Sequence, residues 1–163
     1  FLHKIKLRFL ARATSQFAKW LTGIEIHPAA KIAGGVFIDH GSGVVIGETA
    51  EVHKGTVIYQ GATLGGTGKD TGKRHPTIES GVMIGAGAKV LGPFKVGDNA
   101  RIAANAVVLK EVPENSTAVG IPARVVRRDG EKVQDLDQIH VPDPVAQEIR
   151  RLEERIEQLE KQK

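Results

Sequence analysis

The sequence predicts a mainly β protein: a three-sided parallel solenoid with an N-terminal helix and a C-terminal helical tail. Three observations predict it. Apolar residues recur every six positions through the middle of the chain, glycine is abundant at 19 residues, and aromatic residues make up only 4%. Neither a helix nor an alternating strand has a period of six. A prism with three flat faces does, because each face takes six residues and each coil about 18.

Residues 1–22 are expected to be helical, because their apolar residues are three or four positions apart. Gly23 then ends the helix. The segment starts at Phe1 already inside this pattern, so we expect the remnant of a longer helical region. Its basic residues are compatible with a membrane surface, but packing on the rest of the protein is the expected arrangement. The apolar positions are Leu2, Ile5, Phe9, Ala13, Phe17 and Trp20.

Residues 24–126 carry the six-residue repeat and are expected to form the solenoid, with a little over four coils. Two interruptions shift the repeat, one around Asp39 and His40 and one ending at Arg74 and His75. The first adds two residues and the second about eight. Because a regular repeat explains only a scaffold, its interruptions are candidates for function. The inward positions are Ile26, Ile32, Ile38, Ile46, Val52, Ile58, Leu64, Ile78, Ile84, Val90, Val96, Ile102 and Val108.

Residues 127–143 are polar and are expected to be a linker, and 144–163 a helix. Asp143 suits the N-cap and Pro144 the first helical position. The apolar spacing in the helix suits a coiled-coil seam. A solvated amphipathic tail explains the same pattern. The seam positions are Ile149, Leu152, Ile156 and Leu159.

Composition excludes several classes of function. The chain has no cysteine, which excludes disulfides, thiol nucleophiles and cysteine-ligated zinc and is compatible with a reducing cytoplasm. No apolar run approaches the roughly 20 residues that span a bilayer. The net charge of +4 is spread along the chain without aromatic platforms, so nucleic acid is not an expected partner.

The first interruption, Asp39-His40, is a candidate catalytic pair. Extra residues bulge the wall of the prism and can turn His40 outward. An imidazole takes up a proton near neutral pH, and a neighbouring carboxylate can orient it or bind a substrate ammonium. A structural hydrogen bond from a histidine in the solenoid wall is the simpler alternative.

The second interruption is a glycine-rich loop that begins at Gly65 and ends at Pro76. Its glycines lack the spacing of a nucleotide-binding P-loop. Arg74 offers a planar fork suited to a carboxylate, although a solvated loop charge is the alternative. His40 and His75 provide two ligands for a metal between subunits, but the sequence offers no third, so no metal is expected.

Several motifs together resemble the serine O-acetyltransferase family, within the superfamily of hexapeptide-repeat acyltransferases. The resemblance runs from about residue 2 to 128. The Asp-His pair combined with the glycine-rich loop is its most specific part. The motifs are Ile24–Ala30, Phe37–Gly41, Gly43–Thr49, Thr63–Lys69, Lys73–Pro76 and Gly120–Arg124.

The resemblance implies a left-handed parallel β-helix that transfers acetyl from acetyl-CoA to L-serine in cysteine biosynthesis. It implies His40 as the general base, with Glu25 orienting it where many members have aspartate. Asp39, Arg74 and His75 match the serine-binding group, and His75 also takes part in handling the proton or the oxyanion. The matched coenzyme A contacts are Gly66, Thr67, Ala86, Ala104 and Arg124.

The resemblance also implies partners. Family members are trimers with sites between neighbouring prisms, and a full N-terminal helical region joins two trimers into a hexamer. O-acetylserine sulfhydrylase usually grips a C-terminal isoleucine, whereas this sequence ends at Lys163. Two other functions stay open from the residues themselves: acetyl transfer to a sugar or xenobiotic hydroxyl, and a catalytically silent trimeric β-helix.

Overall fold

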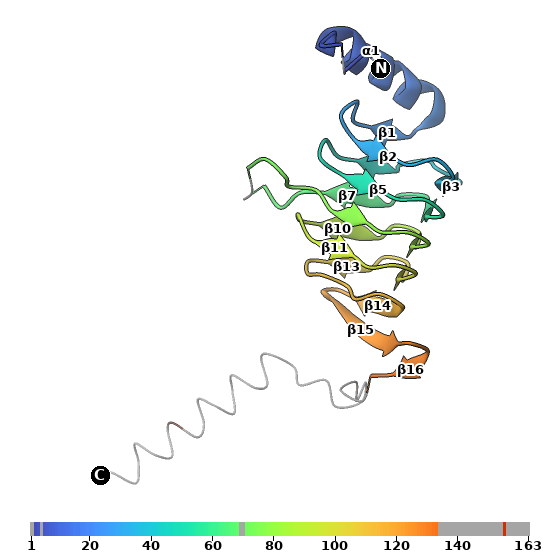
Figure 1. The fold of residues 1–163 in the computed structure, drawn as a ribbon, viewed down its shortest axis with the longest axis vertical. Helices are drawn as coiled ribbons and strands as arrows, with labels where there is room; N and C mark the ends of the chain where they lie inside the picture. The colour runs from blue at the N-terminus through green and yellow to red at the C-terminus, as the bar shows by residue number, and fades with distance from the viewer. Residues whose placement is uncertain (1, 4, 69–70, 134–154, 156–163) are drawn as a thin grey trace. The chain divides into compact units, whose positions relative to one another are not determined.

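The computed structural model describes residues 2–3, 5–68, 71–133 and 155 (Figure 1). Nearly all of them belong to one compact unit that ends at Val133. The predicted C-terminal helix over 144–163, its coiled-coil seam and most of the predicted linker lie outside the described residues. The helix of the compact unit, α1, covers Arg8–Thr22.

Three sheets form the walls of the solenoid, and they are parallel except at the last two strands. Sheet 1 contains β1 (Glu25–Ile26), β4 (Val45–Ile46), β7 (Thr63–Gly65), β10 (Lys89–Leu91) and β13 (Val107–Val108). Sheet 2 contains β2 (Lys31–Ile32), β5 (Glu51–Val52), β8 (Thr77–Ile78) and β11 (Lys95–Val96). Sheet 3 contains β3 (Phe37–Asp39), β6 (Val57–Tyr59), β9 (Met83–Ile84), β12 (Arg101–Ile102), β14 (Ser116–Gly120), β15 (Ala123–Arg128) and β16 (Glu131–Lys132).

The strand register places both interruptions. In sheet 1, Ile26 pairs with Ile46, Ile46 with Leu64, and Leu64 with Val90. The apolar positions therefore stay aligned although the coils differ in length. The extra residues leave the wall at corners, the first between β3 and β4 and the second between β7 and β8. The first corner joins sheet 3 to sheet 1, and the second joins sheet 1 to sheet 2.

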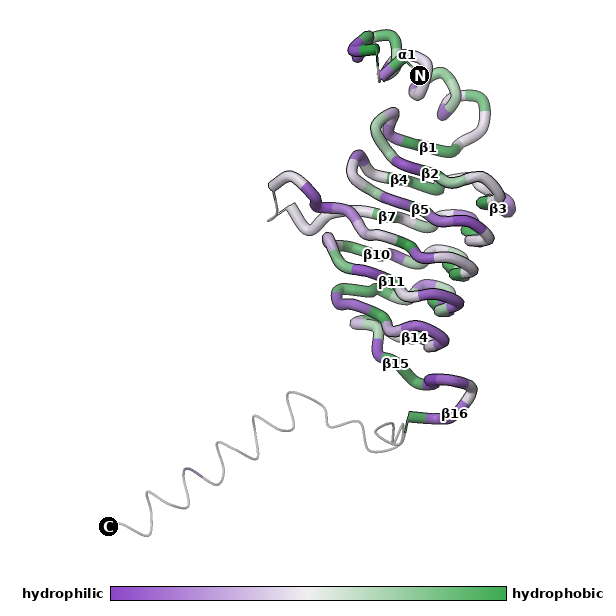
Figure 2. Tube along the Cα trace, in the orientation of Figure 1, coloured by the Kyte–Doolittle hydropathy of each residue, from purple (hydrophilic) through white to green (hydrophobic). Residues whose placement is uncertain are grey.

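The predicted inward residues make the core. From Ile46 to Val108 every one of them is at most 2% exposed. The coil nearest the N-terminus is more open, with Ile32 37% exposed, because no further coil lies beyond it. Figure 2 shows the resulting alternation of hydrophobic and hydrophilic residues along each coil. Alanines fill the narrow corners of the prism: Ala50, Ala62, Ala88, Ala100 and Ala106.

Helix α1 is shorter and more exposed than the pattern predicts. It begins at Arg8 and ends at Gly23, whose φ of 73° and N–H bond to the Lys19 carbonyl confirm the predicted stop. Among its described residues only Ala11 is buried, and Trp20 is 78% exposed. The described part of the chain therefore leaves the aromatic residues Phe17 and Trp20 uncovered. Within the described residues, no helix has the length and apolarity to cross a membrane.

Residues 127–132, which the sequence assigns to a linker, instead continue sheet 3. Strand β15 runs antiparallel to β14, and β16 runs antiparallel to β15. Backbone hydrogen bonds hold these strands. Because their side chains are largely exposed at the end of the solenoid, the polar composition of the segment concealed its strands.

Candidate active site

His40 lies at the corner between sheet 3 and sheet 1. It has a positive φ of 52°, which is uncommon for a residue with a side chain. Its side chain is 80% exposed, and its Nε2 lies 3.7 Å from Oδ1 of Asp39. The first interruption thus turns an imidazole to the surface beside a carboxylate, as the sequence predicts.

A column of backbone positions runs down the same corner from His40. The register of sheet 3 stacks Ile38, Ile58, Ile84 and Ile102, and the corner position follows each by two residues. Hydrogen bonds of 2.8 Å link the last three levels, from Gly87 N to the Gln60 carbonyl and from Asn105 N to the Ala86 carbonyl. At the first level the two extra residues intervene, and Gly61 N binds the Ser42 carbonyl at 2.9 Å instead of that of His40. At about 4.8 Å per coil, the column extends about 14 Å from its first level to its last. Its levels are His40, Gln60, Ala86 and Ala104.

The backbone packs closely near the last two levels of this corner. A side chain on Gly85 would place its Cβ 2.6 Å from the Ala104 nitrogen, so the backbone packs too closely there for anything but glycine. Arg124 lies beyond the last level, exposed on β15. The corner therefore offers small residues at its last two levels, Ala86 and Ala104, and a cation beyond them.

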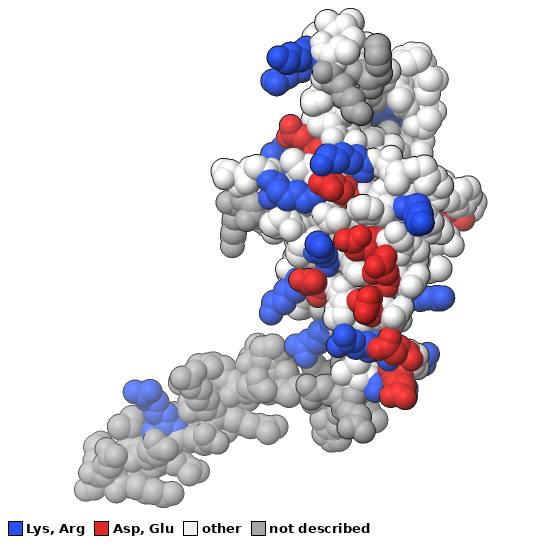
Figure 3. All heavy atoms as spheres, in the orientation of Figure 1, with Lys and Arg blue, Asp and Glu red and all other residues white. Residues whose placement is uncertain are grey.

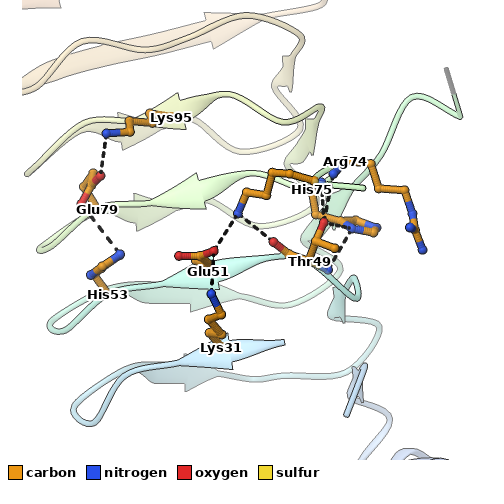
Figure 4. Close-up of polar contacts among 9 residues, drawn as sticks. Lys31, Thr49, Glu51, His53, Arg74, His75, Glu79 and Lys95 are labelled. Atoms are coloured by element: carbon orange, nitrogen blue, oxygen red, sulfur yellow. Dashed lines mark hydrogen bonds and ion pairs between the residues drawn. The ribbon is translucent and has the colours of Figure 1, made fainter. Parts of the chain in front are cut away.

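Arg74 and His75 lie at the other edge of sheet 1, where the second interruption rejoins the wall. Thr49 Oγ1 accepts hydrogen bonds from the backbone N–H groups of Arg74 (3.0 Å) and His75 (3.1 Å) (Figure 4). Nδ1 of His75 accepts the backbone N–H of Thr49 at 3.1 Å and lies 2.9 Å from its hydroxyl. These contacts fix the end of the loop against the preceding coil.

His75 is 8% exposed, and its ring packs on Gly47. A Cβ at Gly47 would lie 2.1 Å from the ring, so the missing side chain creates the space for the imidazole. Burial lowers the pKa of His75, and the positive charge of Arg74 lowers it further. The imidazole is therefore biased toward its neutral form.

Arg74 is held by a carboxylate of its own chain. Its Nη2 donates a short hydrogen bond to Oε2 of Glu48, and this bond is the main cause that lowers the pKa of Glu48. Both side chains are more than a third exposed. One terminal nitrogen of the guanidinium is thus engaged, and among the described residues no second carboxylate binds the rest of the fork.

Lys73 and Gly66 lie at the two ends of the loop that forms the second interruption. Lys73 Nζ donates to the Thr49 carbonyl at 2.7 Å and lies 3.3 Å from Glu51, anchoring the return of the loop. At the start of the loop, a Cβ on Gly66 would lie 2.9 Å from the Arg74 carbonyl. Gly66 therefore lies directly beside Arg74, and the exposed Thr67 follows it in the loop.

Glu25 does not contact His40 within this chain. Its carboxylate binds Lys19 at 2.6 Å and Arg12 at 3.4 Å, both from α1. The hydrogen bond from Lys19 is the main cause that lowers the pKa of Glu25. The carboxylate ties the helix to the first coil.

The two interruptions lie at opposite edges of sheet 1 and do not meet in one chain. The first edge carries His40, Ala86 and Ala104, and the second carries Gly66, Arg74 and His75. In the described part of the chain, no group of three or more histidine, aspartate or glutamate side chains is arranged to hold a metal.

The sequence analysis did not identify Gly47-Glu48-Thr49 as the segment that binds Arg74 and His75. The spacing of the repeat does indicate this contact. The second interruption lengthens its coil to 26 residues, and the hydrogen bond between Thr49 and His75 spans the same separation. Residues 26 apart across this interruption therefore lie on adjacent coils.

Comparisons with known proteins agree with this architecture. Residues 75–110 match the family described as bacterial transferase hexapeptide (six repeats). The chain is 57% identical over 162 residues to the serine acetyltransferase of Bacillus licheniformis, covering 99% of this chain and 75% of that protein.

Solved structures give the same result. The serine acetyltransferase of Brucella abortus in complex with coenzyme A has a TM-score of 0.77 and 47% identity, over 78% of this chain and 51% of that one. That of Neisseria gonorrhoeae in complex with serine has a TM-score of 0.74 and 43% identity, over 77% and 51%. This chain spans about half the length of these two. With its solenoid, its two interruptions and these identities, the chain belongs to the serine acetyltransferase family.

Proposed function

We propose that this chain transfers acetyl from acetyl-CoA to the hydroxyl of L-serine, giving O-acetyl-L-serine and CoA in cysteine biosynthesis. One observation carries the proposal. In a chain of this family, each interruption of the repeat places a histidine and a charged neighbour at an edge of the same sheet. The known relatives support the substrates, because a solved member binds serine and another binds coenzyme A.

His40 is the proposed general base. Its exposed imidazole takes the proton of the serine hydroxyl, and the hydroxyl oxygen attacks the thioester carbonyl carbon. The tetrahedral oxyanion collapses, the carbon–sulfur bond breaks, and the thiolate of CoA leaves. The proton on His40 then passes to that thiolate, so the enzyme returns to its starting state. Glu25 of a neighbouring copy is the proposed partner that orients His40.

The serine site is proposed to combine both edges of sheet 1. Asp39 is suited to the substrate ammonium, and the free part of the Arg74 fork to the substrate carboxylate. His75 adds a hydrogen-bonding nitrogen. Binding both substrates in one cleft makes the attack effectively intramolecular.

Acetyl-CoA is proposed to lie along the corner column. Ala86 and Ala104 present only methyl groups, so an extended pantetheine arm approaches the backbone closely. Gly66 and Thr67 approach from the loop, and Arg124 is the candidate for the phosphates. The thioester then lies at the His40 end of the column.

A homotrimer is the proposed assembly, because the two halves of the site lie on opposite edges of one sheet. Sheet 2 carries an outward ladder of ion pairs, including Lys31–Glu51 at 3.2 Å and Lys95–Glu79 at 3.8 Å, which suits solvent. Figure 3 shows acidic and basic side chains interspersed on the face that it presents. Sheet 3 instead turns Phe37 outward, 60% exposed. A neighbour packed on the remaining faces brings the first edge of one copy to the second edge of the next.

This arrangement predicts complementation between two inactive variants. His40→Ala and Arg74→Ala each damage one half of every site. In randomly mixed trimers an intact pair of halves forms at roughly a quarter of the sites. Purified mixed trimers are therefore expected to regain serine-dependent activity that neither variant has alone. Activity no higher than the sum of the separate variants would place the whole site in one chain.

An assay of thiol release from acetyl-CoA tests the reaction itself. We expect release that depends on L-serine, with O-acetyl-L-serine identified by mass spectrometry. Release with a galactoside but not with serine would favour a sugar acetyltransferase. A folded trimer that releases thiol with neither acceptor would favour a silent module. Light scattering on the same sample gives the oligomeric state and separates trimer from hexamer.

The proposed compartment is the cytoplasm. The absence of cysteine from the sequence suits a reducing environment.

A further inference from the structure

The hydroxyl of Thr49 lies at the centre of the contacts that hold the second half of the site. A hydroxyl has two lone pairs and one proton. The backbone N–H groups of Arg74 and His75, at 3.0 and 3.1 Å, occupy the two lone pairs. The proton is left for the remaining neighbour, Nδ1 of His75 at 2.9 Å. The direction of this hydrogen bond is therefore fixed by the other two.

A second donor faces the same ring nitrogen. The backbone N–H of Thr49 points at Nδ1 of His75 at 3.1 Å. Because two donors are directed at Nδ1, this nitrogen must be unprotonated and act as the acceptor. A proton on Nδ1 would be repelled by both donor hydrogens. In a neutral imidazole the proton then belongs on Nε2.

The opposite ring nitrogen is not completely buried. Within the described residues Nε2 of His75 makes no hydrogen bond, and no buried side-chain polar atom lacks a partner. Nε2 is therefore not completely buried, although the residue as a whole is only 8% exposed. The ring edge lies over Gly47, where a Cβ would come within 2.2 Å of Nε2. The absence of a side chain at Gly47 thus leaves room for this edge of the ring.

We propose that Thr49 is a positioning residue that holds His75 as the neutral Nε2–H tautomer, so that His75 donates a hydrogen bond to a substrate oxygen and is not the base. The catalytic half of this proposal rests on the proposed function. The tautomer itself follows from contacts within the chain. It assigns different tasks to the two histidines: His40 takes the proton, and His75 holds an oxygen.

The charges around the ring agree with a neutral imidazole. Arg74 and Lys73 lie on its own segment, while Glu48 and His27 face it from the two preceding coils. Burial and the Arg74 charge lower the pKa of His75, whereas Glu48 raises it. Removing the Thr49 hydroxyl withdraws a donor that stabilises only the unprotonated Nδ1. The pKa of His75 is then expected to rise.

Nuclear magnetic resonance tests the tautomer without reference to activity. In ¹⁵N-labelled wild-type protein, the His75 ring is expected to give the correlation pattern of a neutral ring protonated at Nε2. Thr49→Val is expected to shift the titration of His75 to higher pH, and Thr49→Ser to keep the wild-type titration. A wild-type ring protonated at Nδ1 would overturn the proposal, whether or not Thr49→Val folds.

Kinetics test the role of the donor. Thr49→Val is expected to lower kcat with L-serine about tenfold, less than the 10²–10³-fold loss typical when a whole oxyanion donor is removed. The KM for acetyl-CoA should stay near the wild-type value, and Thr49→Ser should recover most of kcat. Circular dichroism and light scattering check that each variant folds and assembles. An unchanged kcat in folded Thr49→Val would contradict the positioning role.

Replacing His75 separates a donor from a base. Gln offers an N–H donor but no basic nitrogen, so His75→Gln should retain at least tenfold more activity than His75→Ala. Equal loss in the two variants would contradict the donor role. If wild-type protein has no serine-dependent activity, the proposed function fails while the NMR result still decides the tautomer.

Discussion

Replacing His40 with Ala is expected to lower kcat for L-serine by about 10²- to 10⁴-fold, the range that general base catalysis contributes. Its imidazole is 80% exposed at the first interruption, so the substitution removes little packing. Thermal stability and the KM for acetyl-CoA should therefore change little. Steady-state thiol release at saturating substrates measures the effect.

The matched control is His53→Ala. His53 is also a partly exposed histidine beside a carboxylate, 3.9 Å from Glu79, but it follows β5 on sheet 2, which carries the ion pairs. The activity of His53→Ala should stay within about twofold of wild type, since surface changes away from a site have small effects. Comparable activity in His40→Ala and His53→Ala would remove His40 from the proposed mechanism.

Replacing Arg74 with Ala is expected to raise the KM for L-serine about 10- to 100-fold. Hydrogen bonds to charged groups contribute about 1.5–3 kcal/mol, and each 1.4 kcal/mol is tenfold. The loss should depend on the substrate carboxylate. Ethanolamine, which lacks it, should therefore be a poor acceptor for both proteins, with a KM that the substitution leaves nearly unchanged. Initial rates over a range of each acceptor give the comparison.

Glu48 supplies the control for this experiment, because Arg74→Ala also frees its carboxylate beside the serine site. In the double variant Arg74→Ala/Glu48→Gln that carboxylate is removed as well. A KM that remains high supports direct binding of the substrate carboxylate by Arg74. A KM that returns to the wild-type value would mean that repulsion by Glu48 caused the whole effect. Arg127→Ala, on the exposed β15, checks for a general effect of losing one positive charge.

The period of six predicted the core because each flat face takes six residues, so one residue in six must point inward. Ile46, Ile84 and Ile102 are buried for this reason alone. Counting across the interruptions also gave the coil lengths that the strand register confirms. Where polarity was the only guide, as for Arg127 and Lys132, the prediction of a linker was wrong, because backbone bonds hold those strands.

Helix α1 illustrates a different limit. Its three-to-four spacing correctly predicted a helix and the stop at Gly23. The same pattern implied that the apolar face is covered, yet Phe17 and Trp20 are exposed on this chain. The spacing of apolar residues predicts that one face of the helix is apolar, but it does not predict which surface covers that face.

The sequence by itself determined the prism, its two interruptions and the functional candidates His40, Arg74 and His75, because all of these depend on counting residues along the chain. Only the tertiary structure decided that the interruptions lie at opposite edges of sheet 1 and that Thr49 faces Nδ1 of His75. A hydrogen bond requires donor and acceptor about 3 Å apart in the right direction. That geometry exists only once the coils have stacked, so local sequence does not specify it.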